Sequence, residues 1–198
     1  MMTKNLIIRT IIMSLTLIIL LGNSSCTNSK NEKEESKSTI KEVKTLEKPT
    51  VDLPTAVFMG NTNAIKQHIN NGTVLNTRDA YGSTPLNIAI TFGKTDIANM
   101  LINGGADINA TNADGSTPLH TASFFCRTEI VETLLKNGAD KTIKNHYGST
   151  ALESVSANFE DVKPIYMQIA KDLGPLGLRL DLKRIETTRP LIAKIISE

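Results

Sequence analysis

Thr117-Pro118-Leu119-His120-Thr121-Ala122 lies at the centre of a pattern that recurs through the middle of this 198-residue chain. Gly82-Ser83-Thr84-Pro85-Leu86 returns 33 residues later as Gly115-Ser116-Thr117-Pro118-Leu119, and after 33 more as Gly148-Ser149-Thr150-Ala151-Leu152. Self-similarity at one fixed period of this size indicates structural repeats stacked side by side. The sequence therefore predicts a solenoid whose unit is 33 residues long.

A second marker keeps the same step, because Gly104-Gly105-Ala106-Asp107 returns as Asn137-Gly138-Ala139-Asp140. Between the two markers lie short runs with apolar residues at helical spacing, such as Ile130 and Leu134. Each unit is therefore expected to contain a turn, a helix, a tight loop and a second helix.

The residues at the markers suit the ends of such helices. Thr84 and Thr117 can cap a helix through their hydroxyls, and the proline that follows each of them fits the first helical position. Gly105 and Gly138 can adopt the left-handed backbone that ends a helix. The residues suited to starting a tight turn are Asp79, Asn112 and Asn145.

Residues 117–122, with the following Glu129 to Asp140, resemble the signature of ankyrin repeats. The resemblance implies an all-α ankyrin-repeat solenoid of about four helix-turn-helix units with β-turn fingers, plus a C-terminal cap. It also implies a protein-binding module without catalysis or cofactor, and a His120 ring that hydrogen-bonds backbone and threonine groups within its turn. We place the repeats at 52–171, divided into 52–78, 79–111, 112–145 and 146–171.

The last segment, 172–198, does not continue the period, and we interpret it as a cap over the final repeat. Leu178, Leu180 and Leu182 alternate with charged residues as in a strand, and Thr188-Arg189-Pro190 is typical of a helix start.

Composition argues against several kinds of chemistry. The net charge is +2, and both surplus positive charges, Lys4 and Arg9, lie in the first 25 residues, so no basic face for nucleic acid is expected. The three histidines have no neighbours at metal-ligand spacing, so no metal site is predicted. Cys26 and Cys126 lie in a leader and in a repeat, so we expect no disulfide and interpret Cys126 as a buried thiol.

Residues 1–25 have the charged, apolar and small-residue regions of a signal peptide. The ending Leu21-Gly22-Asn23-Ser24-Ser25-Cys26 resembles the lipobox of bacterial lipoproteins, which implies lipidation of Cys26 and anchoring to a membrane of the cell envelope. The alternative is an ordinary secretory signal and a soluble secreted protein. The polar residues that follow predict a flexible linker over 26–51.

The resemblance places the partner on the fingers and on the ends of the first helices, which together line a concave face in ankyrin stacks. Six of the eight aromatic residues fall at such positions, and aromatic side chains are favoured at interface centres. For Phe58 and Phe124, packing in the core is an equally good interpretation. The predicted partner-binding residues are Arg78, Tyr81, Ser83, Phe92, Asp114, Ser116, Phe125, Lys144, His146 and Tyr147.

We therefore expect a monomeric binding module that engages another protein in the bacterial envelope. The alternative is a dedicated inhibitor or immunity protein that occludes one enzyme or toxin.

Overall fold

The computed structural model describes residues 48–79 and 82–198. The predicted signal peptide, the predicted lipidation site Cys26, all but the end of the predicted linker and Tyr81 lie outside the described residues. The described part of the chain is helical and contains no strand, as the sequence predicts. None of its helices is long and apolar enough to cross a bilayer.

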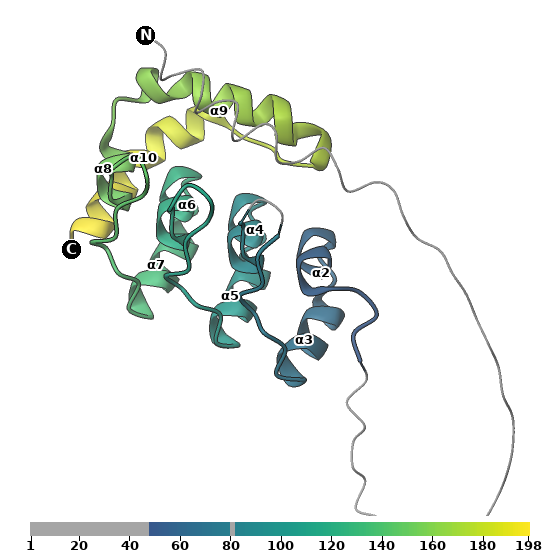
Figure 1. Cartoon of the computed structure of the whole chain (residues 1–198). Helices are drawn as coiled ribbons and strands as arrows, with labels where there is room; N and C mark the ends of the chain where they lie inside the picture. Colours follow the sequence, from purple (N-terminus) through teal and green to yellow (C-terminus); the bar gives the residue numbers. More distant parts are fainter. Residues whose placement is uncertain (1–47, 80–81) are drawn as a thin grey trace, which may run out of the picture.

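The helices form pairs that stand next to one another (Figure 1). The first three pairs are α2 (Leu53–Met59) with α3 (Thr62–Asn70), α4 (Pro85–Thr91) with α5 (Thr95–Asn103), and α6 (Pro118–Phe124) with α7 (Thr128–Lys136). The remaining elements are α8 (Ala151–Ser156), α9 (Phe159–Leu173), the 3-10 turn η1 (Gly174–Leu176) and α10 (Leu182–Ser197).

Threonine caps start three of the first helices at the predicted 33-residue step. The hydroxyls of Thr84, Thr117 and Thr150 each accept a hydrogen bond from the backbone N–H three residues on. Such a cap satisfies one of the N–H groups that a helix start leaves unpaired, worth about 1 kcal/mol. At the other ends of the units, Gly105 and Gly138 have the predicted positive φ.

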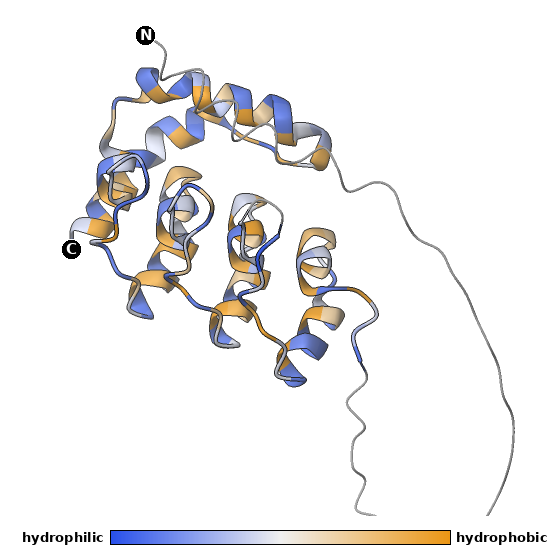
Figure 2. Cartoon of the chain, viewed as in Figure 1, coloured by the Kyte–Doolittle hydropathy of each residue, from blue (hydrophilic) through white to orange (hydrophobic). Residues whose placement is uncertain are grey.

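The core is a thin aliphatic layer that runs through all the units (Figure 2). Ala56, Ala89 and Ala122 are fully buried at equivalent places in the first helices, where a small side chain lets neighbouring units approach closely. Leu86 and Leu119 fill the space beside them. No unit could bury these residues alone, so stability depends on stacking.

The fourth unit differs from the expected helix pair. α8 starts it as predicted, but the helix that packs against both α8 and α7 is α10 rather than α9. The start of α10 lies at the start of α7, because Arg184 donates to the Cys126 carbonyl (3.1 Å). Its end lies near the end of α7, because Lys141 donates to the Ile196 carbonyl (2.9 Å). α10 therefore runs parallel to α7 and fills the place of a second helix.

Two expectations for the C-terminal segment were wrong. Residues 178–182 form no strand, and the last helix starts at Leu182, capped by the Asp181 carboxylate, instead of near Pro190. Pro190 lies inside α10 on an exposed face. The helix tolerates it because Ile185 and Ile192 on the opposite face are fully buried against the stack.

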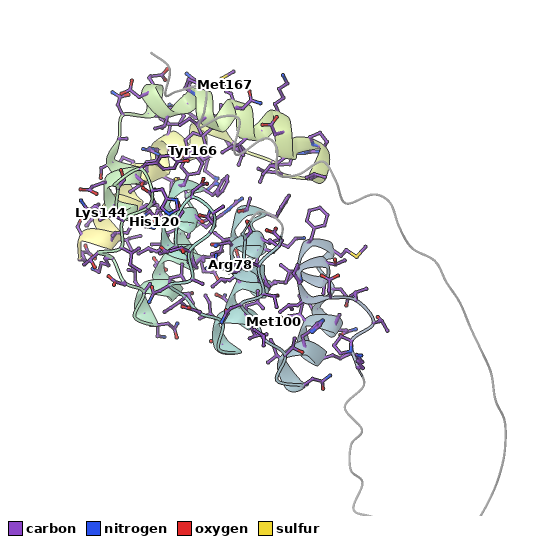
Figure 3. The ribbon with its side chains drawn as sticks, viewed as in Figure 1. Arg78, Met100, His120, Lys144, Tyr166 and Met167 are labelled. Atoms are coloured by element: carbon purple, nitrogen blue, oxygen red, sulfur yellow. The ribbon has the colours of Figure 1, made fainter. Side chains whose placement is uncertain are left out.

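Residues 157–181 are thus an insertion between the two helices of the fourth unit. Within it, α9 crosses over the ends of α6 and α4 (Figure 1). Tyr166 faces the stack from α9 and is fully buried, whereas Met167 next to it points away and is 58% exposed (Figure 3).

Candidate partner-binding surface

Each predicted finger is a turn closed by the side chain of its first residue. The Asn112 carboxamide oxygen accepts from the N–H groups of Asp114 and Ser116, both at 2.9 Å. The Asn145 oxygen accepts in the same way from Tyr147 and Ser149, both at 3.1 Å. These bonds hold the turns in one conformation, as the predicted Asx turns require.

The second finger follows the same rule, because the Asp79 carboxylate accepts from the N–H of Ser83 at 2.8 Å. We call the three turns the finger row, which consists of residues 78–79 with 82–83, 111–116 and 144–149.

Neighbouring fingers are bonded to one another. The Arg78 guanidinium donates to the carbonyls of Thr111 and Gly82, which joins the second and third fingers. The third and fourth are joined through Asp114, whose carbonyl accepts from the His146 N–H at 2.9 Å and whose carboxylate accepts from the Tyr147 hydroxyl at 3.2 Å. The finger row is therefore a preorganised surface, and binding a partner would cost it little ordering entropy.

The fourth finger presents the most accessible groups. Lys144, His146 and Tyr147 are all exposed. Partial burial, together with the negative charge and hydrogen bond of Asp114, raises the pKa of Tyr147 to about 12, so its phenol stays a neutral donor at physiological pH. This finger thus offers one aromatic ring and two basic side chains to a partner.

Gly115 is the position where this arrangement depends on glycine. It is buried with a φ of +71°, and a Cβ there would lie 2.7 Å from Cδ2 of the His146 ring. The imidazole therefore rests on the backbone of the third finger, which only a residue without a side chain allows.

The predicted binding residues at the helix ends do not join the finger row. Phe125 is 6% exposed, so the expectation that its ring is open to a partner was wrong. It is buried because Ile169 of α9 and Leu178 pack against it. Phe92 is half-buried, packs against the same cluster and meets Phe58 edge-on, with ring centroids 5.1 Å apart.

The sequence interpretation missed the group that holds α9 in place. Arg189 is 3% exposed and donates to the Tyr166 hydroxyl (2.9 Å) and to the carbonyls of Ser154 (3.2 Å) and Ala157 (2.8 Å). The negative end of the α8 helix dipole favours a cation there. Tyr166 in turn donates to the Phe124 carbonyl at 2.6 Å, so these bonds join α9 to α6 and α10. A lone arginine in an apolar stripe was the available signal.

His120 has the structural role that the resemblance implies (Figure 3). Its Nδ1 accepts from the Thr117 N–H, and its Nε2 lies 2.9 Å from the Ser149 carbonyl in the next finger. Burial lowers the pKa of His120, which favours the neutral ring that this pattern needs. Within residues 48–79 and 82–198, no three His, Cys, Asp or Glu side chains gather as metal ligands would.

The comparisons with known proteins agree with this geometry. The model of the ankyrin-repeat family matches three repeats over residues 53–145. No curated protein matches the chain. Among solved structures, the chain is similar to the ankyrin repeat domain of Bcl-3, described as a unique member of the IkappaB protein family, with 29% identity and a TM-score of 0.50.

That similarity covers 52% of this chain and 45% of the Bcl-3 chain, so the chain matches less than half the length of that structure. Residues 53–145 are therefore ankyrin repeats, and the described part of the chain is an all-helical ankyrin-repeat solenoid.

Proposed function

We propose that this chain is a non-catalytic binding module whose finger row captures another protein, and that a lipid on Cys26 tethers it to a membrane of a bacterial envelope. Ankyrin repeats are generally protein-interaction scaffolds without catalysis, which supports the first part. The observation that carries it is the bonding of Asp114 to the fourth finger, which fixes Tyr147 and His146 beside Lys144.

The chemistry of the fourth finger suits a protein surface. Tyrosine and cationic side chains combine contact area with strong hydrogen bonds, and tyrosine is enriched at interface hot spots. Tyr147 is 49% exposed while its hydroxyl is already oriented, so a partner can cover the ring without first ordering it. Lys144 and His146 favour a partner patch that carries carboxylates.

A capture experiment tests this role. The full chain with an affinity tag after Glu198 is used to recover proteins from an envelope extract, beside a Lys144→Glu, Tyr147→Ala double variant. The control variant, Lys136→Glu with Met167→Ala, changes equally exposed residues away from the finger row.

We expect a protein recovered by the unchanged chain and by the control, and lost from the finger variant. Equal recovery by all three folded baits would contradict the assignment of the finger row. An enzyme or toxin as the captured protein, inhibited by the chain, would favour the inhibitor function instead.

The tether is proposed from the sequence pattern before Cys26. Several acyl chains on one residue hold a protein at a membrane far more firmly than one chain does. We expect the chain to incorporate labelled palmitate and to sediment with membranes, and Cys26→Ser to abolish both. A Cys26→Ser chain that still sediments would contradict lipid anchoring, and an unlabelled, soluble wild-type chain would favour secretion.

A further inference from the structure

The ends of the first helices carry a second surface that is only partly covered. At the 33-residue step, Phe58-Met59 in the first unit corresponds to Thr91-Phe92 in the second and Phe124-Phe125 in the third. We call these residues the apolar row. Its exposure rises along the stack: Phe125 is 6% exposed, Phe92 is half-buried, and Phe58 and Met59 are 39% and 70% exposed.

The covered part of the row shows what kind of element fits it. Ile165, Ile169 and Leu173 are spaced four residues apart on α9 and pack against the aromatic cluster of the row. Leu178 completes the cover as the chain returns. One helix with an aliphatic stripe is thus the complement of the row where the structure shows it covered.

The cover stops before the row does. α9 ends at Leu173, and the chain reverses through η1 and Gly177, whose φ is +98°. Phe58 and Phe92 are in edge-on contact, so the uncovered part is continuous with the covered part. Figure 2 shows the end of α2 that carries these residues as apolar. Exposed apolar surface that continues a buried interface is typical of a binding site.

We propose that Phe58, Met59 and the open edge of Phe92 bind an amphipathic helix of the partner protein, which lies in line with α9 and presents aliphatic residues four apart. This inference rests on the proposed protein-binding function and adds a second contact to it. Aliphatic anchors at helical spacing in an apolar groove are a common mode of helix recognition. The finger row would then supply polar contacts and the apolar row the buried ones.

The α9 sequence itself provides a probe for this site. The probe is a fluorescein-labelled peptide of residues 159–173 with blocked ends and Pro164→Ala, which removes the helix-breaking residue. Its binding to the full chain is followed by fluorescence anisotropy. A matched peptide with Ile165→Lys and Ile169→Lys, which lacks the aliphatic stripe, is the negative control.

We expect saturable binding to the full chain and at least a tenfold loss of affinity in a Phe58→Gln, Met59→Gln variant. Both residues are exposed, so circular dichroism should show the variant folded. A Val74→Gln, Met167→Gln variant changes equally exposed apolar residues elsewhere and should bind the peptide normally.

Absence of saturable binding to the unchanged chain would overturn the proposal. Equal affinity for the Phe58, Met59 variant would do the same, since the peptide would then be replacing α9 on the covered part of the row. The Lys144→Glu, Tyr147→Ala finger variant should bind the peptide normally. Loss of envelope-protein capture with that variant would leave the proposed function standing even if the peptide binds nowhere.

Discussion

Asn87→His should stabilise the solenoid, because Asn87 stands one period before His120 and lacks the contact that the imidazole makes. In the third unit, the His120 ring reaches the Ser149 carbonyl at 2.9 Å. Asn87 is 3% exposed, and its Nδ2 has no hydrogen-bond partner among the described residues. The equivalent acceptor, the Ser116 carbonyl, lies in the next finger.

The expected gain follows from the groups involved. A new neutral hydrogen bond contributes about 1 kcal/mol, and removing a buried unsatisfied amide donor relieves a penalty of about 1–3 kcal/mol. The substitution gives up one long bond, from the Thr121 hydroxyl to Asn87 at 3.4 Å. A net gain of about 2 kcal/mol corresponds to a rise in Tm of roughly 4–8 °C for a chain of this size.

The assay is urea unfolding followed by far-UV circular dichroism, with buffer on the alkaline side of neutral so that the imidazoles are uncharged. The reciprocal change, His120→Asn, serves as the control and should lower the midpoint. An Asn87→His midpoint that is unchanged or lower would refute the equivalence of the two positions and the account of how fingers are joined to helices.

Three further predictions concern other contacts. Burial lowers the pKa of His120 below 6.5, so its contribution to stability is complete above that pH and is lost as pH falls through it; His120→Asn should flatten that decline in urea midpoints. Gly93→Ala should cost more than Gly105→Ala in thermal unfolding, because both have positive φ but only the Cβ at 93 meets Arg127, at 2.8 Å from Cζ, whereas nothing lies within 4 Å at 105. Tyr166→Phe should cost about 2–3 kcal/mol and speed proteolysis within 157–181, because it removes the buried hydroxyl that joins α9 to α6 and α10.

Local chemistry explains why so much of the repeat region was predictable. Thr117 caps its helix, Asn112 closes its finger and Gly138 ends its unit through groups only a few residues away. Such short-range bonds depend on residue type at fixed spacing, and the 33-residue period shows the same solution several times. The fold class and the finger row follow from these local rules.

The fourth unit was less predictable because two amphipathic helices compete for one place. α9 follows α8 directly and carries an aliphatic stripe, so the sequence pattern favours it as the second helix of the unit. α10 takes the place instead, since Ile185, Ile192 and Ile196 fill the core against α7 and α8. Periodicity reveals that a helix has an apolar face, but it does not say which surface that face meets.

The same long-range choice decided the outcome for Phe125. Its position at a helix end suggested an exposed ring, and only the return of α9 over the third unit buries it. Arg189 interrupts the aliphatic stripe of α10, and its role became visible only with Tyr166 and the end of α8 beside it. Contacts that join residues far apart in sequence cannot be inferred from spacing within one segment.

The most direct test of the central claim is hydrogen–deuterium exchange of the full chain with and without the captured envelope protein. We predict that the partner slows exchange in residues 111–116 and 144–149, where the backbone of the finger row would become covered. Unchanged exchange in these segments, with protection confined to the outer helices α3, α5 and α7, would contradict the assignment of the finger row as the binding surface.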